Sequence, residues 1–239
     1  MIIFEVTEPE NIITVDNEIE RIKHLIVDKE LSPKVIAAKF QRALRKKYGI
    51  VVTTHEDSKA VEPDAMNLNG YFDPSKWMDW ENIELVLAHH RDDADGIVVD
   101  DSGWKNLKFR VKQALMHEFI HREQWNARDG IDGRKADDVL SIFKKFMRTP
   151  DEEQVDYLSD DDEIEAHSHD IAIELHNANL TPEQSMQELR GFSNISSDAK
   201  ESSSLTLWAY GKYFKKDMTH PVIKKMLKKT YQYLQYYAS

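Results

Sequence analysis

The chain contains no cysteine among its 239 residues. This absence excludes disulfide bonds, zinc sites built on cysteine and a thiol nucleophile. No stretch approaches 18 consecutive apolar residues, so we expect no transmembrane helix. The first residues also lack the basic region and apolar run of a secretory signal. The sequence therefore predicts an intracellular or particle-borne protein that is not embedded in a membrane.

Basic residues are also fewer than acidic residues. The chain has 43 acidic and 32 basic residues, and its formal net charge is −11. Because phosphate contacts need a basic surface, we expect no binding to nucleic acid. The charge is uneven: residues 151–165 carry nine acids and no base, whereas residues 212–229 carry seven lysines and one acid. These segments are either two solvated faces, or they attract each other, or they bind separate partners. The basic C-terminal helix is thus a candidate site for a protein partner.

The first half of the chain combines signals for helices and strands. Asp16 is placed to begin one helix, and Ser32-Pro33 to begin another that ends at Gly49. Runs rich in β-branched and apolar residues predict strands at residues 2–6, 50–54, 83–88 and 96–100, of which the last two are expected to pair as a hairpin. A long amphipathic helix is expected over residues 104–126. This half, residues 1–130, is predicted to be an α+β lobe.

The second half, residues 131–239, is predicted to be almost wholly helical. We expect helices over residues 135–147, 160–176, 205–216 and 221–237, and a loop over residues 193–204. Ser159 is the expected N-cap of the second of these helices. Thr181-Pro182 begins a further helix that stops at Gly191. The two lobes are expected to form one catalytic unit.

The most informative motif is His117-Glu118-Phe119-Ile120-His121, an HExxH sequence. On a helix, residues four apart share a face, so both imidazoles can reach one zinc ion. Glu118 then lies where it can accept a proton from a zinc-bound water. The motif predicts a metal-dependent hydrolase with Glu118 as general base.

A catalytic zinc ion needs a third protein ligand, which must come from a separate element. The segment 160–170 is rich in acids and histidines and falls within a predicted helix. Glu163 is the first candidate, with Glu165 and a histidine (His167 or His169) as alternatives. The helical face of Glu163 mixes apolar and polar residues, whereas the face of Glu165 looks more solvated.

Together, these residues resemble the gluzincins, the HExxH metallopeptidases whose third zinc ligand is a glutamate on a downstream helix. In that family a small residue often follows the glutamate by three positions and a polar residue by four, as Ala166 and His167 follow Glu163 here. Thermolysin has aspartate where this chain has His167, so Asp170 is the alternative supporting residue. The segment around residues 157–166 also resembles predicted metallopeptidases of tailed phages, and the compact plan is similar to the ImmA type and the minigluzincins.

The resemblance implies a zincin-like α+β fold, in which a small sheet packs on the HExxH helix and a helical lobe supplies the third ligand. It implies a zinc-dependent metallopeptidase acting on a peptide or protein, with His117, His121 and Glu163 as ligands. Tyr157 and His220 are candidate donors to the oxyanion. The implied location is the cytoplasm, including that of a bacterial host, or a virion. Two alternatives stay open: a non-catalytic structural or interaction protein, and a metal-dependent cell-wall amide hydrolase.

Several other residues suggest sites only weakly. His89-His90 could flank the cleft but fits an exposed pair better, and the acids at residues 92–95 lack the spacing of a calcium loop. The aromatic residues near 77–80 and 231–237 are expected in the core or at an interface.

Overall fold

The computed structural model describes residues 10–59, 61–73, 76, 81–128 and 149–237. The chain divides into two compact units, Met1–Ile131 and Asp132–Ser239. It combines helices with small sheets, so the general α+β prediction is confirmed. Within the described residues, no helix has the length and apolar character needed to cross a membrane. The strand expected at residues 2–6, the helix expected at 135–147 and the tryptophans Trp77 and Trp80 lie outside the described residues.

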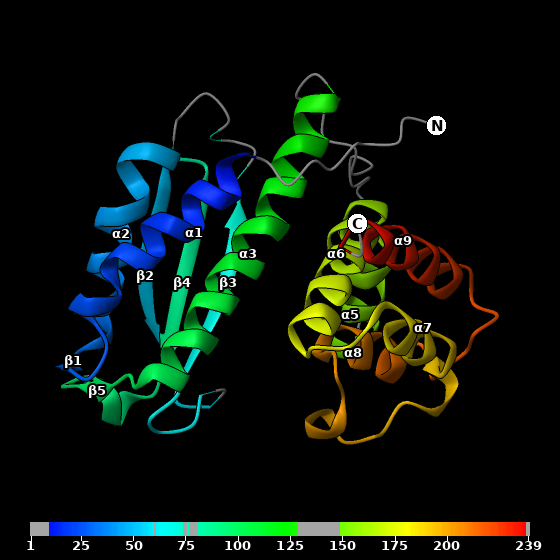
Figure 1. Ribbon diagram of the computed structural model, residues 1–239. Coiled ribbons are helices and arrows are strands. Elements are labelled where there is room, and N and C mark those ends of the chain that lie inside the picture. The colour runs from blue at the N-terminus through cyan, green and yellow to red at the C-terminus, as the bar shows by residue number, and fades with distance from the viewer. Residues whose placement is uncertain (1–9, 60, 74–75, 77–80, 129–148, 238–239) are drawn as a thin grey trace. The chain divides into compact units, whose positions relative to one another are not determined.

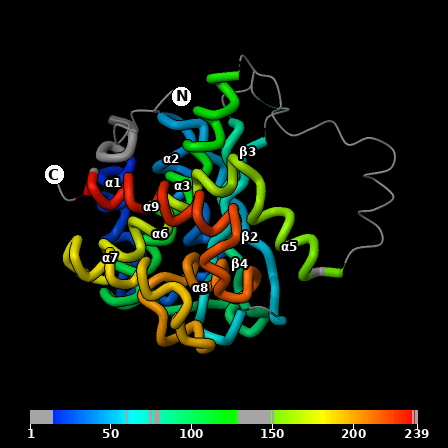
Figure 2. The backbone as a smooth tube through the Cα atoms, turned by 90° about the vertical axis from the view of Figure 1, so that its right-hand side faces the viewer, coloured from blue at the N-terminus to red at the C-terminus, as the bar shows by residue number. Residues whose placement is uncertain are grey.

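The first unit is built on a three-stranded sheet of β2 (Ile50–Glu56), β4 (Ile83–His89) and β3 (Met66–Phe72), in that order. Strand β2 runs parallel to β4, and the two lie side by side in Figures 1 and 2. Strand β3 runs antiparallel to β4, with Gly70 opposite Leu85. Since β3 is paired on one side only among the described strands, it forms an edge of this sheet.

Strand β3 was not predicted, and the expected hairpin is wrong. The sequence of β3 alternates apolar residues with asparagine and includes a glycine, and both asparagine and glycine are typical of turns. After β4 the chain enters a 3₁₀ turn, Arg91–Asp93, in which the buried Asp93 carboxylate accepts a hydrogen bond from the Asp64 amide. The following strand β5 (Ile97–Val98) pairs with β1 (Glu30–Leu31) in a separate two-stranded sheet.

Helices α2 and α3 pack against the main sheet, and α1 packs against these two helices. Helix α1 (Glu10–Ile22) begins before Asp16, so that residue is not its N-cap. Helix α2 (Pro33–Tyr48) has the predicted ends: the Ser32 side chain accepts from the Val35 amide, and Gly49 takes a left-handed conformation at φ 68°. Helix α3 (Asp101–Ala127) contains the HExxH motif and packs chiefly against β3. The core between these elements includes Ile36, Phe40, Leu44, Ile50, Leu85, Trp104 and Leu115.

The second unit is helical and consists of α5 (Pro150–Ser159), α6 (Asp161–Asn177), α7 (Pro182–Arg190), α8 (Leu205–Tyr213) and α9 (Pro221–Tyr237). Helix α6 packs against α5, α8 and, most extensively, α9. The capping box at Thr181 is confirmed. The N-cap of α6 is Asp160 rather than Ser159, which instead ends the unpredicted helix α5. Short 3₁₀ turns at Phe192–Asn194 and Ala199–Glu201 occupy much of the predicted loop.

Candidate metal centre

His117 and His121 lie one turn apart in the second half of α3. Their ring centroids are 4.7 Å apart, with 76° between the ring planes. His117 is close to buried and His121 is partly exposed. The helix therefore brings both imidazoles to one face, as two ligands of a single metal ion require.

His121 is oriented by a residue that the sequence did not single out. Its Nδ1 atom lies 3.0 Å from Oε1 of the buried Gln124, one turn further along α3. Because an amide oxygen only accepts hydrogen bonds, this contact places the proton on Nδ1 and the lone pair on Nε2. A neutral imidazole held in this way is the form that binds a metal ion. The i, i+3 spacing of the two residues was the available signal.

Glu118 packs directly against the edge strand β3. Its side chain is buried, and a Cβ atom added at Gly70 would lie 2.9 Å from both Cγ and Oε1 of Glu118. Real Cβ atoms essentially never approach other atoms so closely, so the glycine provides the space that the Glu118 carboxylate occupies. Gly70 was missed because its requirement arises from the packing of a strand on a distant helix.

In the second unit, α6 groups Glu163, His167 and Asp170 on one face. His167 Nε2 lies 3.8 Å from Glu163 Oε2, and its Nδ1 lies 3.4 Å from Asp170 Oδ2. The three side chains are between 7% and 15% exposed. The imidazole thus lies between two carboxylates of its own helix, and the Glu163 carboxylate belongs to a strongly polar, mostly buried cluster.

Two tyrosine rings flank this cluster. Tyr157 and Tyr210 both meet the His167 ring edge-on, with centroids 5.6 and 6.0 Å away. The Tyr210 hydroxyl donates a hydrogen bond of 3.1 Å to the Leu158 carbonyl. Burial, reinforced by the negative charges of Glu163 and Asp170, raises the pKa of Tyr210 well above its usual range. Tyr210 therefore stays neutral and packs beside the cluster without adding charge to it.

The alternative ligands Glu165 and His169 face helix α9 instead. Glu165 accepts a hydrogen bond of 2.6 Å from the Tyr233 hydroxyl and pairs with Lys229. His169 is 1% exposed, and its Nε2 lies 2.7 Å from the Tyr237 hydroxyl. The expectation that this face is solvated is wrong, because α9 covers it. Their contacts with α9 leave Glu163 and His167, which share the other face of α6, as the candidates for the third ligand.

The two candidate oxyanion donors differ in their surroundings. His220 precedes α9, where its Nδ1 accepts from the Val222 amide at 3.3 Å and its ring packs on Phe214 at 4.9 Å. These contacts give His220 a structural role. Tyr157, by contrast, is 43% exposed and lies beside the Glu163–His167 pair.

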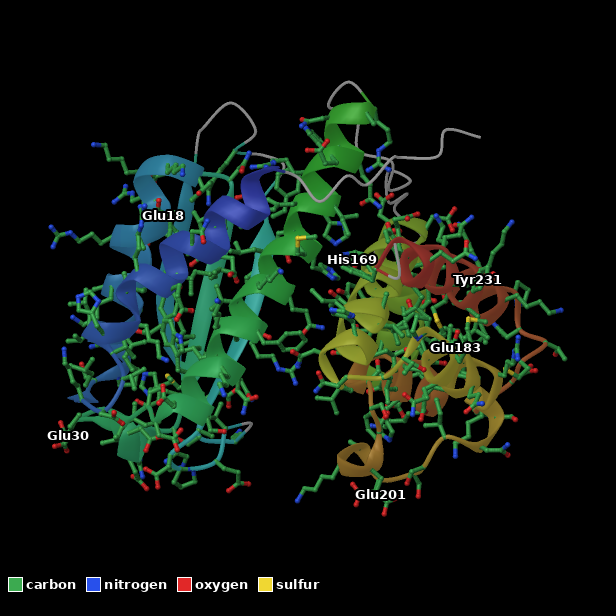
Figure 3. The ribbon with its side chains drawn as sticks, in the orientation of Figure 1. Glu18, Glu30, His169, Glu183, Glu201 and Tyr231 are labelled. Carbon is green, nitrogen blue, oxygen red and sulfur yellow. The ribbon has the colours of Figure 1, made fainter. Side chains whose placement is uncertain are left out.

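The weaker candidates are explained by local structure. His89 is buried, contrary to expectation, and its Nδ1 lies 2.9 Å from the His90 carbonyl oxygen. The His90 side chain caps the following 3₁₀ turn. A groove of about 600 Å³ in the second unit is lined by residues of α7 and α9 that include Glu183, Met186, Tyr231 and Leu234. Glu183 and Tyr231 are labelled in Figure 3. None of the candidate site residues lines it.

The described residues thus form two groups: His117, Glu118 and His121 on α3 in the first unit, and Glu163, His167 and Asp170 on α6 in the second. No known protein family, no curated protein and no solved structure matches this chain. Any assignment of function must therefore rest on the chemistry of these two groups.

Proposed function

We propose that the protein is a zinc-dependent metallopeptidase of the gluzincin type, in which His117, His121 and Glu163 hold one zinc ion. The observation that carries the proposal is the arrangement on α3. Two histidines share one helical face, and the glutamate between them is held against the edge strand of a sheet. A zincin-like fold, with the helical unit supplying the third ligand, is part of the same proposal.

The donor types fit zinc. Two imidazole nitrogens and one carboxylate oxygen form the ligand set of many catalytic zinc sites, which keep a fourth position for water or substrate. The Gln124 contact favours the His121 tautomer that such a site needs. Asp170, next to His167, adds negative charge on the face of α6 that carries Glu163. This negative charge favours the binding of a cation by Glu163.

The mechanism follows from the position of Glu118. Bound zinc would act as a Lewis acid that polarises the scissile carbonyl and lowers the pKa of an attacking water. The Glu118 carboxylate accepts the proton of that water and then delivers it to the nitrogen of the departing amine. Its burial against Gly70 restricts the side chain to a small range of positions, which favours efficient transfer. Tyr157 is the better placed of the two candidate oxyanion donors.

The substrate class follows from the sheet. An extended peptide can add to an exposed strand edge through main-chain hydrogen bonds, and β3 offers such an edge beside Glu118. We therefore propose a peptide or an extended protein segment as the substrate, bound along β3.

The test compares Glu118→Gln with Glu123→Gln, which makes the same chemical change at an exposed position of the same helix. Purified proteins are assayed for bound zinc and for cleavage of a mixed peptide library. We expect one zinc ion per chain in all three proteins, and cleavage in the wild type and Glu123→Gln only. Full cleavage by Glu118→Gln would refute the mechanism.

The same proteins are also assayed on purified cell wall, and two other results would favour other functions. Bound zinc without cleavage of any peptide, but with release of cell-wall fragments, would indicate an amide hydrolase that uses the same residues. No zinc in the wild type, even after reconstitution, would favour a structural or interaction protein.

A further inference from the structure

Helices α6 and α9 are joined by a row of polar contacts that repeats at every turn. The partners on both helices advance in steps of four residues, so the two helices run parallel along this row. We call the row the α6–α9 ladder; its contacts are Asp161–Lys225, Glu165–Lys229, Glu165–Tyr233 and His169–Tyr237. His169, one end of the ladder, is labelled in Figure 3.

The ladder joins the acid-rich segment to the lysine-rich segment. At its centre the Glu165 carboxylate receives both the Lys229 ammonium group and the Tyr233 hydroxyl, and its side chain is only 19% exposed. The Asp161 rung is more exposed, so water weakens it. Beside the ladder, the buried Ser168 hydroxyl lies 3.2 Å from the Met226 carbonyl oxygen, which shows how closely the two helices approach.

The ladder lies on the opposite side of α6 from Glu163. Successive residues of an α-helix are 100° apart, so Glu163 and Glu165 project about 200° from each other. His167 and Asp170 share the side of Glu163, and His169 shares the side of Glu165. Because α9 holds one face of α6, the opposite face, which carries Glu163, has a fixed orientation.

Apolar packing alone specifies rotation and register poorly, because similar side chains can exchange places after a shift of one turn. Partly buried charged and hydroxyl groups specify the register more strictly, since a shift would leave them without hydrogen-bond or ion-pair partners. Single polar positions fix the register of coiled coils for this reason. Along α9 the ladder residues are two lysines followed by two tyrosines, so a shift of one turn in either direction would leave Asp161 or His169 without its partner.

We infer that α9 is a positioning helix for the third zinc ligand: the α6–α9 ladder fixes the rotation and register of α6, and so the direction in which Glu163 is presented. Lys229 and Tyr233 are the positioning residues, and they act through Glu165 and the helix backbone. The inference rests on the proposed function, because it gives Glu163 the role of a zinc ligand.

The test measures zinc affinity of the full-length protein by competition with a chelator. Lys229→Met removes the central charge of the ladder, and Lys228→Met makes the same change at the exposed neighbouring position. Tyr233→Phe removes a single oxygen atom and serves as a second, milder variant. Far-UV circular dichroism and thermal melting show that each variant is folded. Each change is also made together with Glu163→Ala.

We expect Lys229→Met and Tyr233→Phe to weaken zinc binding roughly ten-fold, the lower end of the effect of residues that orient a ligand. Lys228→Met should leave the affinity unchanged. In proteins that already carry Glu163→Ala, the ladder substitutions should have no further effect, because no third ligand is left to position. A general loss of stability would instead weaken binding in both backgrounds.

The ladder's role is overturned if Lys229→Met and Tyr233→Phe bind zinc as tightly as Lys228→Met, or if their effects persist without Glu163. Failure of the proposed function has a different signature. Either the wild type binds no zinc, or Glu163→Ala binds it with undiminished affinity. In both cases the positioning role falls together with the ligand assignment.

Discussion

Replacing Gly70 with alanine tests whether β3 sets the position of the Glu118 carboxylate. The new methyl carbon would lie 2.9 Å from Cγ and Oε1 of Glu118, whereas ordinary contacts begin near 3.4 Å. Something must therefore move by about 0.5 Å. Strand β3 is paired with β4 and packed under α3, so the side chain of Glu118 is the part most able to turn away. Because a displacement of about 1 Å at a catalytic group can cost 10²-fold in rate, we expect kcat to fall between about ten- and 100-fold.

The same substitution should leave the metal ligands intact. The three atoms nearest to the new methyl carbon all belong to Glu118 and not to the proposed ligands His117 and His121, so bound zinc should stay at one ion per chain. KM should change little, because the main-chain edge of β3 is retained. Alanine also costs less conformational entropy in a strand than glycine, so the thermal midpoint should not fall sharply.

The assay is steady-state peptide cleavage, with metal content and thermal melting measured on the same preparation. Asn69→Ala is the matched control, because it introduces alanine at the adjacent, exposed position of β3. Wild-type kcat in Gly70→Ala would refute the reasoning that the glycine positions Glu118. A loss of zinc would also refute it, since the change would then act through the ligands.

Two further predictions follow from single contacts. Gln124→Leu should weaken zinc binding about ten-fold, measured by chelator competition, because His121 Nδ1 loses its acceptor; unchanged affinity would show that the contact does not orient the imidazole. Phe40→Ala should lower the free energy of unfolding by about 3–5 kcal/mol in urea titration, since the ring is completely buried against Trp104; a loss below 1 kcal/mol would contradict its place in the core.

Local sequence rules predicted most of the helices correctly. The ends of α2 were visible because Ser32 and Gly49 act on backbone atoms only a few residues away. The capping box at Thr181 is another contact of this kind. The N-cap of α6 was displaced by one residue, because Ser159 and Asp160 are both good capping residues and only the geometry of α5 distinguishes them.

Long-range pairing accounts for what the sequence did not reveal. Strand β3 owes its conformation to β4, since its own residues include the turn formers asparagine and glycine. The chain after β4 is held by Asp93, whose partner Asp64 lies 29 residues earlier. Nothing in the local pattern indicates either contact, which explains the wrong hairpin.

The candidate site likewise combines features that the local sequence reveals with features that depend on long-range packing. His117, Glu118 and His121 form a local motif that can be read directly from the sequence. Two other features depend on packing between distant segments: the space that Gly70 leaves for Glu118, and the hydrogen bond that Glu165 accepts from Tyr233 of α9. Glu165 looked solvated because its partner Lys229 is 64 residues away.

The charges around Glu163 bear on the proposed zinc site. Glu163 and Asp170 are both nearly buried, and the His167 imidazole lies between their carboxylates. Burying a carboxylate is costly, and a nearby positive charge favours its ionised form. The hydroxyl of Tyr210 donates to the Leu158 carbonyl and stays neutral, so it supplies no charge. The negative charge of Asp170 would also attract a divalent ion held by Glu163, so replacing Asp170 with asparagine should weaken zinc binding although Asp170 is not one of the proposed ligands.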